Sequence, residues 1–125
     1  MITRIDHFVI TARSVEDSCD FYTRVLGFER RDRPDRPVAL HFGPHKIHVH
    51  QFGKTGNLVA KTPTPGSQDF CLITERPLSE FIAHLTAHKV PIEVGPVMRD
   101  GAVGAMTSVY FRDPDGNLVE VSEYA

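Results

Sequence analysis

The alternation of apolar and polar residues predicts that the chain begins with a β-strand followed by a helix. Residues 2–11 are rich in β-branched and aromatic side chains, and every second residue, His7 among them, falls on one face of the strand. Ser14 is a favourable N-cap residue, and apolar residues then recur at helical spacing until Gly27. The first thirty residues therefore predict a strand, a tight connection and a helix.

The same plan occurs twice along the chain. Short apolar runs separated by proline and glycine predict three further strands, near residues 27–32, 37–43 and 46–52. Residues 53–67, which include Gly56, are rich in glycine and proline and predict a crossover. A strand near residue 69, a helix opening at Pro77 and three strands then follow, the strands near residues 91–97, 106–112 and 117–123.

This order predicts an α+β fold made of two βαβββ units whose curved mixed sheets surround a cavity. The units cover about residues 2–52 and 68–123, and we expect residues 1–125 to form a single domain. Each unit carries a potential metal ligand on its first strand and another on its last. These side chains are His7, His50, Asp69 and Glu120. Because the two half-sheets can direct equivalent positions at one cavity, the repeat favours a site for one divalent ion.

Composition narrows the range of partners. Hydrophobic residues make up 41% of the chain, charged residues 24%, and the formal net charge is −2, so neither disorder nor a nucleic-acid partner is expected. No apolar run is long enough to cross a bilayer, and we expect a cytoplasmic protein without membrane contact. Cys19 and Cys71 lack C-x-x-C spacing, and we expect both to be small buried thiols.

Three segments together resemble the vicinal oxygen chelate superfamily, which contains glyoxalase I, extradiol dioxygenases and bleomycin-resistance proteins. They are residues 5–10 with 20–28, the repeat beginning at Asp69, and the run Phe-Arg-Asp-Pro-Asp-Gly-Asn-Leu-Val-Glu-Val over residues 111–121. The last is the most specific, because its glutamate follows the turn glycine by four residues. Residues 46–51 and 90–96 look most similar to the group that includes glyoxalase-domain-containing protein 5.

The resemblance implies metal-binding roles for residues at the ends of both units. His7 and Glu120 match the family's ligands, whereas Asp69 stands where the enzymes usually have histidine. At the end of the first unit, matching Phe42 to Phe111 selects His50, which we prefer. Matching the Ile-x-Val pattern around position 48 selects His48 instead, and both histidines fall on one face of their strand.

The resemblance also implies a function. One divalent ion (Zn, Ni, Fe, Mn or Co) would act as a Lewis acid on a small oxygen-chelating metabolite in a glyoxalase-like lyase or isomerase reaction. Glu120 and His50 are the expected proton carriers, and His48, Arg99 and Tyr110 the expected substrate-binding residues. An extradiol-type Fe(II) dioxygenase and a metal-free drug-binding or toxin-binding resistance protein are the alternatives. Related two-unit proteins commonly form homodimers, which implies a site at a subunit interface.

Overall fold

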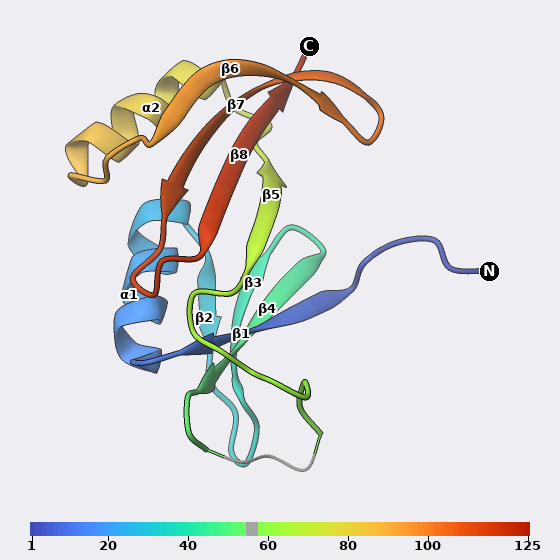
Figure 1. The fold of residues 1–125 in the computed structure, drawn as a ribbon, viewed down its shortest axis with the longest axis vertical. Coiled ribbons are helices and arrows are strands. Elements are labelled where there is room, and N and C mark those ends of the chain that lie inside the picture. The colour runs from blue at the N-terminus through green and yellow to red at the C-terminus, as the bar shows by residue number, and fades with distance from the viewer. Residues whose placement is uncertain (55–57) are drawn as a thin grey trace. The chain divides into compact units, whose positions relative to one another are not determined.

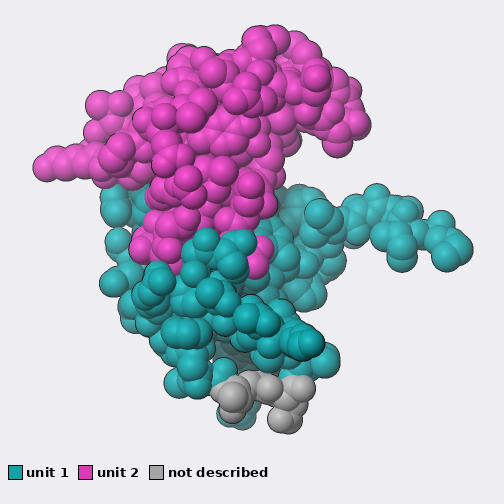
Figure 2. Space-filling model, viewed as in Figure 1, with its two compact units in different colours: residues 1–67 teal, residues 68–125 magenta. Residues whose placement is uncertain are grey.

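The computed structural model describes residues 1–54 and 58–125. The chain divides into two compact units, residues 1–67 and 68–125, which Figure 2 shows in different colours. Each unit runs through a strand, a helix and three further strands, and each contains one mixed four-stranded sheet. The predicted α+β fold with two βαβββ units is therefore confirmed. The predicted crossover residue Gly56 lies outside the described residues.

Unit 1 places one helix against its sheet (Figure 1). Its elements are β1 (His7–Ala12), α1 (Val15–Leu26), β2 (Glu29–Arg31), β3 (Val38–Phe42) and β4 (His45–Gln51). The sheet order is β1-β4-β3-β2, in which β1 runs parallel to β4 and the other pairs are antiparallel. Ile10, Leu40 and Ile47 are fully buried, so one face of the sheet is core.

Both ends of α1 are set by local hydrogen bonds. The hydroxyl of Ser14 accepts from the Asp17 backbone N–H at 3.1 Å, as the N-cap prediction requires. Gly27 ends the helix with φ of 72°, a left-handed conformation that suits glycine. Between these residues, Tyr22 and Val25 on the apolar stripe of the helix are buried. The amphipathic pattern thus fixes which face of α1 meets the sheet.

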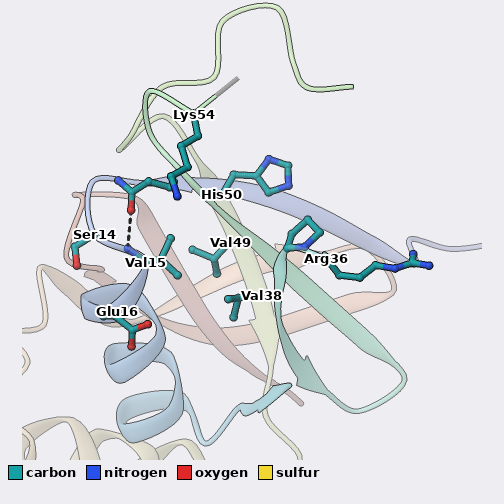
Figure 3. A pocket seen from close by; sticks show the side chains of 10 residues that line it. Ser14, Val15, Glu16, Arg36, Val38, Val49, His50 and Lys54 are labelled. Atoms are coloured by element: carbon teal, nitrogen blue, oxygen red, sulfur yellow. Dashed lines mark hydrogen bonds between the residues drawn. The ribbon is translucent and has the colours of Figure 1, made fainter. Parts of the chain in front are cut away.

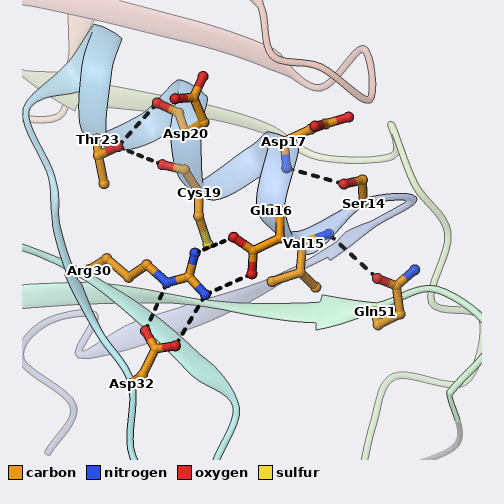
Figure 4. A network of polar contacts seen from close by, with 10 residues as sticks. All are labelled: Ser14, Val15, Glu16, Asp17, Cys19, Asp20, Thr23, Arg30, Asp32 and Gln51. Atoms are coloured by element: carbon orange, nitrogen blue, oxygen red, sulfur yellow. Dashed lines mark hydrogen bonds and ion pairs between the residues drawn. The ribbon is translucent and has the colours of Figure 1, made fainter.

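Arg30 connects α1 to the end of β2. Its guanidinium donates to both carboxylate oxygens of Glu16, at 2.7 and 2.9 Å, and also binds Asp32 at 2.8 Å (Figure 4). These carboxylates raise the pKa of Arg30 above its ordinary value, and the arginine lowers the pKa of Glu16 in turn. Because the acidic partners are exposed, we assign the cluster a modest orienting role.

Unit 2 repeats the plan of unit 1. Its elements are β5 (Asp69–Ile73), α2 (Leu78–Ala87), β6 (Val94–Gly101), β7 (Gly104–Arg112) and β8 (Leu118–Tyr124). The sheet order is β5-β8-β7-β6, with β5 parallel to β8. The ring of Phe81 on α2 lies 5.9 Å from that of Phe111 on β7. The helix therefore covers the sheet face that carries Phe111, Val119 and Val121.

Two strands differ from the sequence predictions by more than two residues at one end or at both. The first strand begins at His7 rather than at residue 2, because the parallel ladder with β4 starts with the pair of His7 and Lys46, and Ile2 and Ile5 are exposed. The strand expected near residues 91–97 is β6, which begins at Val94 and extends to Gly101, where it pairs with Gly104 of β7. Among the described residues, no helix has the length and apolar character needed to cross a bilayer.

Candidate functional site

Unit 1 presents three histidines on the sheet face opposite its core. Residues paired in a parallel ladder direct their side chains to the same side, and alternate residues point to opposite sides. His7 pairs with Lys46, while His48 and His50 of β4 pair with Val9 and Thr11 of β1. Ile10, Ile47 and Val49 alternate with these residues and are buried. The predicted ligand His7 thus shares a face with both candidates on β4.

The imidazoles of His7 and His48 are neighbours. Their ring centroids lie 5.0 Å apart, with 49° between the ring planes. The Nδ1 atom of His7 is 2.7 Å from a carboxylate oxygen of Asp6. When Nδ1–H of neutral His7 donates to that oxygen, Nε2 keeps its lone pair, which is the tautomer and orientation that metal-bound histidines commonly have.

His48 has the protonation state that a metal ligand needs. Burial lowers the pKa of its imidazole, and the neighbouring charges of Lys46, His7, His50 and His41 lower it further. A pKa below the ordinary value of 6.5 leaves the ring neutral at physiological pH. Because only the neutral imidazole coordinates a metal, the surroundings of His48 favour binding without a proton being displaced.

His50 lies at the far end of this face. Its ladder partner Thr11 is four residues along β1 from His7. It borders an open cavity of about 600 Å³ at the beginning of α1, whose lining includes Val38 and Val49. Figure 3 shows the His50 imidazole directed away from these two valines. Among the described residues, the His50 ring makes no ring contact with His7, in contrast to the ring of His48.

The pairing registers of the two units show which histidine is equivalent to Glu120. In unit 2, Glu120 pairs with Cys71, two residues after the first-strand candidate Asp69. In unit 1, the residue two positions after His7 is Val9, and it pairs with His48. His48 therefore occupies in unit 1 the place that Glu120 occupies in unit 2. By register, the counterpart of Glu120 is thus His48 and not His50, the residue that we preferred from the sequence.

Glu120 lies among polar side chains from three neighbouring strands. Tyr110 of β7 and Cys71 of β5 are its ladder partners on either side, and Ser122 follows two residues later on the same face of β8. The Ser122 hydroxyl donates to Oε2 of Glu120 at 3.2 Å. Asp69 begins β5 on the same face and is exposed. Both predicted carboxylate ligands thus belong to one face of the second sheet.

A buried hydroxyl pair supports the Glu120 carboxylate. Ser108 and Ser122 are fully buried, and their hydroxyl oxygens are 2.6 Å apart. The sulfur of Cys71 lies 3.3 Å from the Ser122 oxygen. Because Ser122 has one hydroxyl proton and gives it to Glu120, both neighbours donate to Ser122. Ser122 therefore connects Ser108 and Cys71 to the Glu120 carboxylate.

Arg99 and Tyr110 extend the polar row to the edge strand. The Nε–H of Arg99 donates to the Tyr110 hydroxyl at 3.1 Å, and the guanidinium carbon lies 5.5 Å from the ring centroid. Burial raises the pKa of Tyr110, and Glu120 adds to this effect. Arg99 lies on strand β6, and these contacts hold its guanidinium beside the Tyr110 ring.

The sequence did not identify Asp6, Cys71, Ser108 and Ser122 as parts of this site. Asp6 directly precedes His7, and Ser122 follows Glu120 at strand spacing, so local signals existed for both. Cys71 is exposed, contrary to the expectation that it is buried, whereas Cys19 is buried as predicted. In residues 1–54 and 58–125, no group of three or more His, Cys, Asp or Glu side chains is placed to hold a metal ion.

The thiol of Cys71 offers a test of this description of unit 2. Although the residue as a whole is exposed, its sulfur is partly shielded from water beside Ser122. This desolvation and the Glu120 carboxylate raise the pKa of the thiol above the ordinary value of 9.0, since both disfavour the thiolate. We expect the rate of Cys71 alkylation by iodoacetamide, followed by peptide mass spectrometry, to reach half its maximum above pH 9.0. Glu120→Gln removes the neighbouring negative charge and should lower that midpoint. A wild-type midpoint below 9.0 would contradict the described surroundings.

Comparisons with known proteins agree with this architecture. The model of the Glyoxalase/Bleomycin resistance protein/Dioxygenase superfamily matches residues 4–121. Virulence protein STM3117 of Salmonella typhimurium is 42% identical over 124 residues, which cover 99% of this chain and 86% of that protein. Its crystal structure has a TM-score of 0.97 and covers 100% of this chain and 99% of that one.

Two further proteins are similar over nearly the whole chain. Glyoxalase domain-containing protein RDO1 of Mycosarcoma maydis is 42% identical over 123 residues, covering 98% of this chain and 69% of that protein. The structure of the integron cassette protein VCH_CASS1 of V. cholerae is 43% identical with a TM-score of 0.97, covering 100% of this chain and 98% of that one.

Proposed function

We propose that this chain, which belongs to the Glyoxalase/Bleomycin resistance protein/Dioxygenase superfamily, is a metalloenzyme that catalyses a glyoxalase-like lyase or isomerase step on a small oxygen-chelating metabolite. The proposal depends on one observation. Both sheets carry ligand-type side chains at equivalent ladder positions, His7 and His48 in unit 1 and Asp69 and Glu120 in unit 2. Folding of the repeated units does not by itself require a ligand-type side chain at each of these four positions.

The chemistry of these four side chains fits one divalent ion. Two neutral imidazoles and two carboxylates balance the charge of a dication, and nitrogen with oxygen donors suits Zn, Ni, Fe, Mn or Co. We propose His7, His48, Asp69 and Glu120 as the ligands. Asp6 orients His7 from outside that set. When bound, the ion supplies Lewis-acid stabilisation of negative charge that develops on a substrate oxygen.

The surrounding residues of the chain have distinct roles in this proposal. Glu120 moves a proton to or from the substrate, and Ser122 holds its carboxylate in place. We leave His50 outside the ligand set, because its register differs from that of Glu120, and assign it the role of second proton carrier. Arg99 and Tyr110 contact the substrate, and so does the edge of the His48 ring. A cytoplasmic location, a homodimer with the site at its interface and a place in the glyoxalase-domain-containing protein 5 group stay predictions.

Metal analysis of protein purified without a histidine tag tests the proposal. We expect about one divalent ion per chain by plasma mass spectrometry, and its loss in His7→Ala and in Glu120→Ala. His45→Ala is the matched control, because His45 lies on β4 with its ring against Phe42, 5.9 Å between centroids. The proposal fails if the wild-type protein contains no stoichiometric metal and if both variants bind small-molecule ligands as tightly as the wild type does. The function would then be that of a metal-free binding protein.

An Fe(II) dioxygenase is the second candidate. His7, His48 and Glu120 together supply two imidazoles and a carboxylate, the set that non-haem iron oxygenases use. Consumption of oxygen by the iron-loaded protein in the presence of catechols would favour this candidate. Turnover without oxygen, with Zn, Ni or Co in place of iron, would favour the lyase or isomerase.

A further inference from the structure

We infer that the substrate carries a carboxylate separate from its metal-chelating oxygens, and that Arg99 binds this carboxylate with Tyr110 holding the guanidinium. The inference rests on the proposed function and adds the class of substrate, a small hydroxy or oxo diacid. Arg99 lies on β6, the edge strand of the second sheet, which is next to the strand of Tyr110.

The guanidinium of Arg99 is held in place but not neutralised. Its Nε–H donates to Tyr110 at 3.1 Å, and its Nη1 donates to the backbone oxygen of Met98 at 2.9 Å. Two contacts to neutral groups fix the plane of the guanidinium while leaving its positive charge intact. For Nη2, no hydrogen bond to another group is recorded among the described residues, so this nitrogen keeps two N–H donors for a ligand.

The other arginines in this unit have acidic partners. Arg112 binds Glu93 through two nitrogens, at 3.1 and 2.8 Å, and Arg76 binds Glu80 at 3.0 Å. No ion pair with a carboxylate is recorded for Arg99 in the described part of the chain. A planar cation with free donors and a stacked phenol ring is the arrangement that recognises a carboxylate, because the fork of N–H groups matches its two oxygens.

The order of side chains across the sheet relates this cation to the proposed base. Tyr110 pairs directly with Glu120 across β7 and β8, and its hydroxyl accepts a hydrogen bond from Arg99. The guanidinium of Arg99, the phenol of Tyr110 and the carboxylate of Glu120 therefore follow one another across β6, β7 and β8. An acid group bound at Arg99 would hold the adjoining carbon atoms on the side of Tyr110 that faces Glu120. A substrate with one acid group and its chelating oxygens only would leave Arg99 without a partner.

Binding of L-malate and L-lactate tests the inference, because both have a hydroxyl next to a carboxylate and only malate has a second carboxylate. Calorimetry on metal-loaded wild type should show about tenfold tighter binding of malate than of lactate. Arg99→Gln should remove most of that difference and leave lactate binding unchanged. Tyr110→Phe, which removes the oxygen that holds Arg99, should remove part of it, and Arg76→Gln, the matched control, none.

The same comparison on chelator-treated protein separates this inference from the proposed function. Metal content decides the proposed function, whereas NMR shifts induced by malate in the metal-free protein report the carboxylate contact alone. Malate shifts that disappear in Arg99→Gln, with the other shifts of that variant intact, would support the inference whether or not metal binds. Equal responses to malate and lactate in wild type, or a preference for malate that survives Arg99→Gln, would overturn it.

Discussion

Replacing His48 with alanine is expected to weaken the binding of Zn(II) or Co(II) by about a hundredfold or more, whereas replacing His50 is expected to change it less than about threefold. The reason is the ladder register, which places His48 two residues beyond the His7 position, at the place of Glu120 in the second unit. The ring of His48 also lies 5.0 Å from that of His7. Removing one of two neighbouring imidazoles leaves unit 1 with a single donor.

Competition with a chromophoric chelator measures both affinities on metal-free protein. His45→Ala on the same strand controls for the loss of any histidine, and His7→Ala sets the expected size of a ligand loss. If His50→Ala weakens binding and His48→Ala does not, the assignment made from the sequence is right and the register argument fails. Comparable losses in both variants would place both histidines in the ligand set.

This choice shows the limit of local sequence patterns. Strand periodicity gives the face on which a side chain lies, and His48 and His50, two residues apart, satisfy it equally well. Only the pairing with β1 distinguishes them, and register depends on contacts between segments about forty residues apart. The repeat itself was predictable because both units use the same alternation of apolar residues, the same helix signals and the same closing strands.

The surroundings of Glu120 were less predictable for the same reason. Its position in a strand and on a polar face follows from residues 117–123 alone. Its neighbours Tyr110 and Cys71 come from two other strands, one of them parallel and about fifty residues away. The sequence does not decide whether Arg99 lies in a loop or in a strand, because glycines such as those at positions 101 and 104 are common both in loops and in tight hairpins. Pairing of Arg99 with Met106 across the β6–β7 hairpin makes it part of a strand.

Replacing Asp113 with alanine is expected to lower the free energy of unfolding by about 3 kcal/mol. The carboxylate of this buried residue accepts from the backbone N–H groups of Asp115 and Asn117, both at 2.9 Å, and from the side-chain amide of Asn117 at 2.7 Å. Asn117 is fully buried, and its amide oxygen accepts from the backbone N–H of Gln68 at 2.8 Å. The turn before β8 is thereby tied to the segment that leads into β5.

Alanine would leave the side-chain amide of Asn117 without its acceptor in a site from which water is excluded, so the loss exceeds that of an exposed hydrogen bond. Urea denaturation followed by circular dichroism should show a lower midpoint with an unchanged slope. Asp115→Ala keeps the backbone donor of the same turn and should cost less than about 1 kcal/mol. The hydrogen bonds of Asp113 and Asn117 hold together the segments that lead into β5 and β8, the strands that carry Asp69 and Glu120. The variant should therefore also weaken metal binding. An unchanged midpoint would mean that the hydrogen bonds of the buried turn do not contribute to stability. The fixed spacing between Gly116 and Glu120 would then need a different explanation.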